Sequence, residues 1–258
     1  MVILRNVSKV FSNGTLALTG MSLDVKRGEF TSLLGPSGCG KSTALRIIAG
    51  LGAPTTGTVE WPSSQINARG LPEGDIGFVF QDPTLMPWQT VFGNVYLPLR
   101  LQGIGKAAAR DRIMEKLAVV GLADFAQSYP RELSGGMKMR VSIARALVTN
   151  PRLLLMDEPF AALDEITRQK LNDDVLRLWR DTGVTVIFVT HSVFESAYLS
   201  NRIVVMRARP GQVFTDLPLH NSGVRDESYR TSEEYRQTCA EVSAALQAAI
   251  HVGEARVA

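Results

Sequence analysis

Apolar and polar positions follow two different patterns along the chain. Short β-rich runs broken by Gly, Pro and charged turns occupy residues 2–34 and recur at 57–61, 76–80, 152–156 and 184–189. Such runs predict strands. Between about 90 and 150 the apolar residues instead recur every three or four positions, over 107–120 and 136–148, which predicts helices. The pattern therefore predicts an α/β core interrupted by a helical lobe.

The end of the chain carries a helical pattern of its own, over 231–250. Its apolar stripe comprises Tyr235, Cys239, Val242, Leu246 and Ile250. Thr231 and Glu234 have the spacing of a capping box at its start. We expect a helix that either packs on its own domain or contacts a partner subunit.

Composition narrows the classes of protein. A chain of 258 residues with 45% hydrophobic content can bury one large core, with or without a smaller lobe. The net charge is only +3 and the sequence has no run of basic residues, so we expect no nucleic-acid partner. No apolar run approaches the roughly 20 residues that cross a bilayer, and the N-terminus lacks a signal-peptide pattern. Cys39 and Cys239 predict no disulfide, which suits a reducing cytoplasm.

A glycine-rich segment follows the strand predicted at 30–34. It fits G-x-x-x-x-G-K-[ST], in which loop amides hold phosphates, the lysine reaches the β and γ groups and the hydroxyl ligates Mg²⁺. The predicted nucleotide-binding residues are Gly35, Pro36, Ser37, Gly38, Cys39, Gly40, Lys41, Ser42 and Thr43. A nucleoside triphosphate is the expected ligand. Cys39 lies beside Lys41 and a helix N-terminus, so we expect a reactive thiolate whose alkylation inhibits.

Two adjacent carboxylates end the apolar run at 153–156. Because side chains alternate along a strand, Asp157 and Glu158 can serve different tasks. With the phosphate loop upstream, we expect Asp157 to hold Mg²⁺ through its water shell and Glu158 to take a proton from the water attacking the γ-phosphate. The alternative is a capped helix start.

Two further polar residues follow predicted strands. Gln81 comes after 76–80 and is predicted to touch the metal or to position water. His191 comes after 184–190, at the edge where parallel sheets bind ligands. We expect His191 to contact the γ-phosphate, and a structural histidine is the alternative.

A second phosphate-type cradle opens the helix predicted at 136–148. Ser134, Gly135 and Gly136 place bare amides at a helix N-terminus. One triphosphate does not need two cradles from one chain. Either the chain has two nucleotide sites, or this cradle closes over the nucleotide of another copy.

These motifs together resemble the ATPase subunit of ATP-binding cassette (ABC) transporters. The resemblance covers residues 2–215 and includes, in the family's order, the phosphate loop, Gln81, the signature 133–137, Asp157–Glu158, the loop 161–164 and His191. It implies a P-loop NTPase core with a mainly parallel sheet, an N-terminal antiparallel β subdomain and a helical subdomain inserted at about 82–150. The ATPase domain would span 1–220 and a helical tail 221–258.

The same resemblance implies partners. Phe11 would stack on adenine, and two cassettes would pair head to tail, so that Ser134 and Gly136 of one chain complete the site on Lys41 of the other, with Asp164 communicating between them. Integral membrane subunits would hold the chain at the cytoplasmic face of the inner membrane, and a solute-binding protein would act indirectly. The apolar segment 85–88 would lie near the groove for the membrane subunit, or belong to the core of the lobe.

Within the family, residues 81–88, Met137 and 191–211 look like the branch that serves nitrate, sulfonate and taurine importers, and the segment at 191 also resembles ATPases of pyrimidine-precursor importers. Residues 138–140, Lys-Met-Arg, depart from the Arg-Gln-Arg common in that branch. The rivals are a soluble cassette acting on ribosomes or DNA, which usually carries fused cassettes or charged insertions, and a P-loop phosphotransferase, which the signature argues against.

Overall fold

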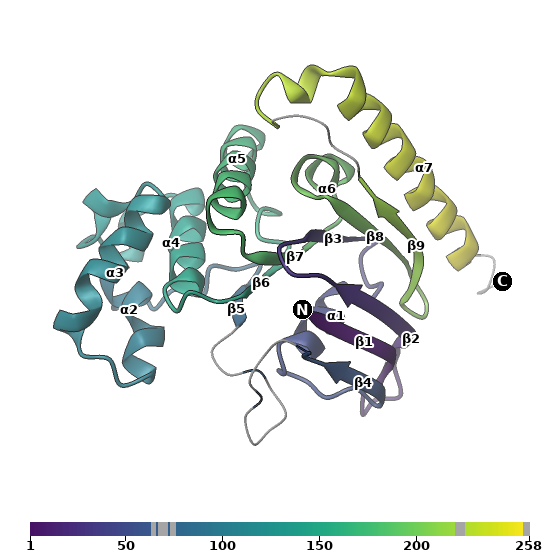
Figure 1. Ribbon diagram of the computed structural model, residues 1–258, viewed down its shortest axis with the longest axis horizontal. Helices are drawn as coiled ribbons and strands as arrows, with labels where there is room; N and C mark the ends of the chain where they lie inside the picture. The colour runs from purple at the N-terminus through teal and green to yellow at the C-terminus, as the bar shows by residue number, and fades with distance from the viewer. Residues whose placement is uncertain (63–65, 67–71, 73–75, 220–224, 255–258) are drawn as a thin grey trace. The chain divides into compact units, whose positions relative to one another are not determined.

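The computed structural model describes residues 1–62, 66, 72, 76–219 and 225–254, and it divides the chain into two compact units (Figure 1). The first unit comprises residues 1–73 and 185–258, and the second comprises 74–184. The predicted boundary between the ATPase domain and the tail, at 220 and 221, lies outside the described residues.

The first unit begins with an antiparallel sheet, as predicted for the N-terminal part. Strand β1 (Val2–Val10) lies between β2 (Leu16–Val25) and β4 (Thr56–Glu60), and both pairings are antiparallel. Towards its C-terminal end β2 alternates between exposed and buried residues. One face of the strand is therefore covered and the other faces solvent.

A second sheet in this unit carries the strand that leads into the phosphate loop. Strand β3 (Phe30–Leu34) pairs in parallel with β7 (Thr185–Thr190) and with β8 (Arg202–Arg207), and β9 (Gln212–Pro218) runs antiparallel to β8. Every residue of β3 and β7 is buried. Leu34 pairs with Thr190. The phosphate loop and His191 therefore leave the same edge of this sheet.

The C-terminal tail is helical and packs on its own unit. Helix α7 (Glu233–Glu254) lies along β8 and β9 in Figure 1, and its fully buried Val242 and Ala249 join Leu34, Ile203 and Val205 in one apolar cluster. This favours the first of the two expected roles.

The start of α7 corrects one sequence prediction. The Ser232 hydroxyl, and not that of Thr231, accepts a hydrogen bond from the Tyr235 amide at 3.2 Å, whereas Thr231 donates to the Ser228 carbonyl at 2.9 Å. A short 3₁₀ turn, Tyr229–Thr231, precedes the helix and uses the hydroxyl that the capping box needed.

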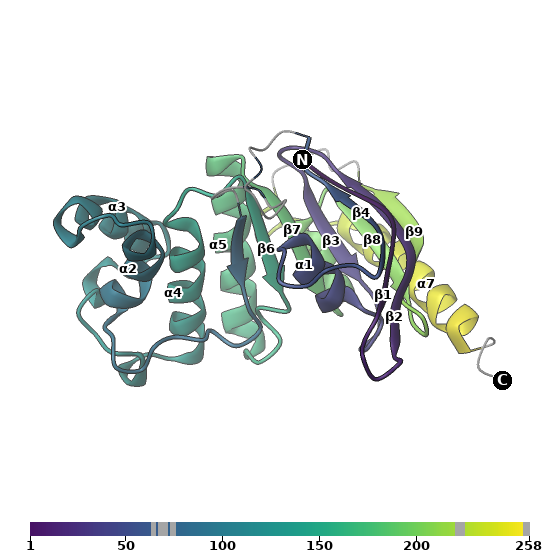
Figure 2. The ribbon, with the colours of Figure 1, turned by 90° about the horizontal axis from the view of Figure 1, so that it is seen from below.

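In its described residues, the second unit contains two strands, four α-helices and two short 3₁₀ turns, Ala123–Phe125 and Pro130–Glu132. Strands β5 (Ile76–Val79) and β6 (Leu153–Asp157) pair in parallel. The helices are α2 (Val91–Leu101), α3 (Lys106–Val119), α4 (Gly135–Leu147) and α5 (Glu165–Thr182). Helix α4 contacts the other three helices and β5 (Figure 2). It is therefore the packing centre of this unit.

The strands predicted at 57–61, 76–80, 152–156 and 184–189 form within one residue of those positions, as β4, β5, β6 and β7. In the described part of the chain, no helix combines the length and the apolar content needed to cross a bilayer.

Candidate functional site

The phosphate loop joins the buried strand β3 to helix α1 (Lys41–Ile48) in the first unit. Gly38 and Gly40 have φ values of 77° and 88°, which glycine adopts without strain. No side chain caps α1. The helix N-terminus next to the loop carries a partial positive charge, which suits an anionic ligand.

Lys41 is buried, with 3% of its surface exposed, and its ammonium is held by the loop itself. The Nζ atom donates to the Gly35 carbonyl at 2.8 Å and to the Pro36 carbonyl at 3.1 Å. Carbonyl oxygens partly offset the cost of burying the charge. The only cation of the motif is thus fixed within its own loop.

Cys39 differs from the sequence expectation of a reactive thiol. Its side chain is fully buried, and its Sγ lies 3.9 Å from Lys41 Nζ. Burial denies a reagent access to this thiol. We therefore expect slow alkylation of Cys39 in the folded protein.

His191 follows β7 in the first unit and is exposed. The turn that carries it is held by hydrogen bonds on either side. The Thr190 hydroxyl donates to the buried Glu195 carboxylate at 2.5 Å and accepts from the Ser192 amide at 2.9 Å. Sequence reasoning missed Thr190 and Glu195. In the sequence, this pair is visible only as two polar residues five positions apart, one before and one after the start of a helix.

Phe11 lies at the tip of the β1–β2 hairpin and is 44% exposed. Its amide donates to the Thr15 carbonyl at 2.9 Å, which closes the turn, and Lys9 Nζ lies 5.6 Å from the ring centroid. An exposed ring with a cation beside it can stack on a base.

The carboxylate pair lies in the second unit, and its backbone corrects one part of the sequence argument. Strand β6 ends at Asp157, which is 7% exposed, and Glu158 has φ 44°. Glu158 is thus left-handed and not extended. The alternation of strand residues therefore does not extend to Glu158, because β6 ends at Asp157 and the chain turns at the next residue.

Gln81 follows β5 and is exposed on a bend. Val79 pairs with Met156, so Gln81 and the carboxylate pair leave the same edge of the β5–β6 pair. Thr84, three residues later, is left-handed, with φ 47°.

Asn94 organises the segment that follows Gln81, and sequence reasoning missed it. This fully buried residue of α2 accepts a hydrogen bond from the Met86 amide at 2.7 Å. Its amide nitrogen donates to the carbonyls of Met86, Gln89 and Thr90. The signal was one amide on the apolar face of a helix.

The signature forms the N-terminus of α4. Ser134 is exposed and caps the helix by accepting from the Met137 amide at 3.3 Å. A Cβ on Gly136 would lie 2.5 Å from Thr167 Cγ2 of α5, whereas one on Gly135 would meet Leu163 at 3.5 Å. Gly136 is therefore required for packing of α4 on α5.

Asp164 caps α5 and is exposed. Its carboxylate accepts from the Thr167 amide at 3.0 Å, and this hydrogen bond lowers the pKa of Asp164. The residue therefore has a helix-capping function whether or not it also communicates between chains.

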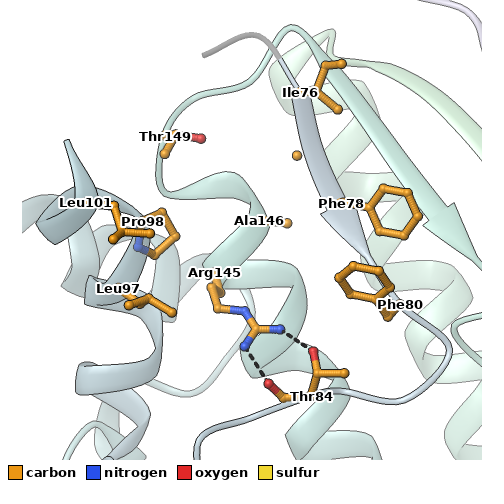
Figure 3. Close-up of a pocket in the computed structure, with 11 residues that line it drawn as sticks. Ile76, Phe78, Phe80, Thr84, Leu97, Pro98, Leu101, Arg145, Ala146 and Thr149 are labelled. Carbon is orange, nitrogen blue, oxygen red and sulfur yellow. Dashed lines mark hydrogen bonds between the residues drawn. The ribbon is translucent and has the colours of Figure 1, made fainter. Parts of the chain in front are cut away.

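A pocket of about 350 Å³ lies in the second unit between β5, α2 and α4 (Figure 3). Phe78 and Phe80 line one side, and Leu97, Pro98 and Leu101 line the other. Of the nearby segment 85–88, Leu85 and Met86 are half-buried and Trp88 is 71% exposed. Trp88 thus does not belong to the core of the lobe.

The predicted site residues therefore fall into two sets. The first unit brings together the phosphate loop and His191 at one sheet edge, and also carries Phe11. The second unit brings Gln81 to the edge where Asp157 and Glu158 lie, and places Ser134–Gly136 beside the Asp164 turn. Among the described residues, no three His, Cys, Asp or Glu side chains cluster as a metal site.

Comparisons with known proteins agree with these motifs. Residues 18–161 match the family model described as ABC transporter. The chain is 44% identical over 227 residues to the taurine import ATP-binding protein TauB of Jannaschia sp., covering 86% of this chain and 84% of that one. It is 39% identical over 236 residues to the nitrate import ATP-binding protein NrtD of Synechocystis sp., covering 90% and 87%.

A solved structure shows the same fold. The dimeric structure of MJ0796, a bacterial ABC transporter cassette, is 37% identical, covers 86% of this chain and all of that one, and superposes with a TM-score of 0.75. The same cassette has been solved in a post-hydrolysis state bound to ADP and Pi. The extent of these matches, together with the phosphate loop, the signature and the carboxylate pair, establishes that the chain is an ATP-hydrolysing member of the ABC transporter family.

Proposed function

We propose that this chain is the ATPase subunit of an importer and that it works as a head-to-tail homodimer beneath separate membrane subunits. One observation carries the proposal. The chain forms two phosphate-type cradles, the loop before Lys41 and the turn at Ser134. In a dimer of two chains, each nucleotide would be held by the Lys41 loop of one chain and contacted by the Ser134 turn of the other.

Binding of ATP is assigned to the first unit. The amides of 35–43 and the ammonium of Lys41 would hold the phosphates, and the exposed ring of Phe11 would stack on adenine. The helix N-terminus adds about half a positive charge to the loop. The Lys41 ammonium already donates to two carbonyls of the loop, so the side chain does not need further ordering when the phosphates bind.

The donor set suits Mg²⁺. The Ser42 hydroxyl, the Gln81 amide oxygen and the Asp157 carboxylate are hard oxygen ligands, and no thiolate or imidazole is needed. These residues would hold the ion together with phosphate oxygens and water. When bound, Mg²⁺ neutralises charge on the β- and γ-phosphates.

Proton transfer is assigned to Glu158. Glu158 lies on the left-handed turn directly after β6, and its carboxylate would accept the proton of the attacking water. His191 would contact the γ-phosphate from the turn fixed by Thr190, and Gln81 would orient the water. A positioned base of this kind contributes about 10² to 10⁴ in rate.

The membrane subunits are assigned to the second unit. An apolar segment of a membrane subunit would dock on this unit, against the exposed Trp88 or the pocket lined by Leu97, Pro98 and Leu101. This contact would hold the chain at the cytoplasmic face of the membrane as a peripheral protein. A solute-binding protein would act through the membrane subunits, and no nucleic acid takes part.

The solute follows from the relatives. Proteins named for taurine and nitrate import are 44% and 39% identical to this chain over most of its length, and both solutes are small molecules that carry an oxyanion group. We propose a nitrate-, sulfonate- or taurine-like solute, with a pyrimidine precursor as the alternative. The membrane subunits and the binding protein make this choice, because no residue of the cassette is assigned to the solute.

Gel filtration tests the composite site. Glu158→Gln should bind MgATP without hydrolysing it and elute as a dimer, while Lys41→Ala should remain a monomer. Adding Ser134→Arg to Glu158→Gln should abolish the dimer, whereas adding the matched Ser228→Arg, at another exposed serine, should not. Persistence of the dimer in the Ser134→Arg double variant would refute the head-to-tail arrangement.

Co-purification tests the membrane assignment. The tagged chain should recover an integral membrane protein from detergent extracts, and Trp88→Ala should reduce the yield. Leu51→Ala, which alters a similarly exposed apolar side chain in the first unit, serves as the control. Recovery with ribosomes or DNA alone would support the soluble-cassette reading instead.

A further inference from the structure

Arg145 is a half-buried cation whose hydrogen bonds are all made to uncharged groups. It lies in the last turn of α4, and its NH1 donates to the Thr84 carbonyl at 2.8 Å. Its NH2 donates to the Pro83 carbonyl at 2.9 Å, to Thr84 Oγ1 at 2.9 Å and to Ser142 Oγ at 3.4 Å. Burial lowers the pKa of Arg145. Three of the four acceptors belong to the two-residue segment 83–84.

The conformation that Arg145 holds is an unfavourable one. Thr84 is left-handed, with φ 47°, which is rare for a β-branched residue. Such a backbone persists only when its surroundings fix it. The planar guanidinium binds both the carbonyl and the hydroxyl of Thr84, together with the preceding carbonyl. A lysine ammonium at this position lacks the fork that makes these contacts together.

The position of this clamp relates it to the proposed chemistry. Thr84 is three residues from Gln81, and α4 carries Ser134 at its other end, about 16 Å away at 1.5 Å per residue. One side chain thus fastens the Gln81 segment to the helix that presents the signature. All of these residues belong to the second unit.

The clamp also borders the pocket described above. Arg145 and Thr84 lie at one end of it, next to Phe80 (Figure 3). Asn94 fixes the segment from Met86 onward, and Arg145 provides hydrogen bonds that tie residues 83–84, just before it, to α4.

We propose that Arg145 is a positioning residue for ATP hydrolysis, which holds the 81–84 segment on α4 so that Gln81 meets the nucleotide in one orientation. The inference rests on the proposed function of Gln81. It predicts a loss in kcat with little change in KM, because the phosphate loop and Phe11, to which binding of ATP within the chain is assigned, lie in the first unit.

The test compares Arg145→Met with Arg145→Lys and with the matched control Arg140→Met. Arg140 lies on the same helix, but it pairs with Asp174 of α5 at 2.6 Å. For Arg145→Met we expect kcat to fall about ten- to hundredfold and KM for MgATP to change less than about twofold. Arg145→Lys should keep part of the rate, and Arg140→Met should stay near the wild-type value.

Hydrogen exchange provides the second measurement. In Arg145→Met, amides of 82–90 should exchange about tenfold faster, while those of β7 in the first unit should not change. Faster exchange with an unchanged kcat would overturn the positioning role, and unchanged exchange would show that Arg145 does not hold the segment. If Arg145→Met fails to fold, Arg145→Lys decides on the same two measurements.

The outcomes separate this inference from the proposed function. A wild-type protein that binds MgATP but does not hydrolyse it would refute the function, irrespective of how Arg145 variants exchange. Wild-type hydrolysis with a normal kcat in both Arg145 variants would refute only the inference.

Discussion

The backbone of Glu158 leads to a prediction in which stability and activity move in opposite directions. At φ 44° a residue with a Cβ costs about 1–2 kcal/mol relative to a right-handed conformation. Glycine does not have this cost, but its extra freedom in the unfolded chain costs about 0.4–1 kcal/mol. Glu158→Gly should therefore stabilise the protein by about 0.5–1 kcal/mol, while removing the proposed base.

Glu158→Gln is the matched variant, because it retains the Cβ and the strained backbone but cannot accept the proton. Its unfolding free energy should stay within about 0.5 kcal/mol of wild type, and its hydrolysis should fall by about 10² to 10⁴. Urea unfolding of the two variants and of wild type gives the stabilities. Steady-state phosphate release gives the rates.

Two results would contradict this reasoning. If Glu158→Gly were less stable than Glu158→Gln, the left-handed turn would not be a source of strain. If Glu158→Gln hydrolysed ATP at the wild-type rate, Glu158 would not be the base, and Gln81, His191 or the substrate phosphate would have to activate the water.

Three further predictions follow from local packing and charge. Gly211→Ala should weaken ATP binding, measured by titration, because its Cβ would lie 2.2 Å from the Cys39 carbonyl, whereas Gly52→Ala, with nothing within 4 Å, should not. Gly136→Ala should lower the unfolding free energy by about 1–3 kcal/mol, while Gly135→Ala should cost less. The lowered pKa of Asp164 implies a contribution to stability that is present above its unfolded pKa and is lost as pH falls through the folded pKa. Asp164→Asn should therefore flatten the acid side of a stability-versus-pH curve, and an unchanged curve would argue against the cap.

The motifs were predictable because each is local. A glycine-rich loop between a strand and a helix needs only adjacent residues, and so does a carboxylate pair that ends a buried strand. The same holds for α5, where Asp164 begins the helix and Gly183, at φ 62°, ends it. These signals were present in the sequence, although the helix itself was not predicted.

The contacts that organise the loops were not predictable from local pattern. Arg145 and Thr84 are 61 positions apart, and Asn94 is a fully buried polar residue among the buried apolar residues of α2. A polar residue on an apolar face indicates that a partner exists, but not which one. The Thr231 capping box failed for a related reason, since two hydroxyls in succession compete for the same helix start and only the preceding turn decides between them.

The glycines of the phosphate loop have different causes, which the motif does not distinguish. A Cβ on Gly35 would lie 2.6 Å from the Met206 carbonyl, and one on Gly40 would lie 2.7 Å from Leu18 Cδ2. A Cβ on Gly38 would meet nothing within 4 Å, and there only φ 77° demands glycine. The loop therefore packs against β2, β8 and the turn at Gly211. The Gly211 amide donates to the Ala17 carbonyl at 3.1 Å. At Gly35 and Gly40, the space that a side chain would need is filled by neighbouring residues of the protein. The shape of the loop therefore depends on segments up to about 170 residues away in the chain.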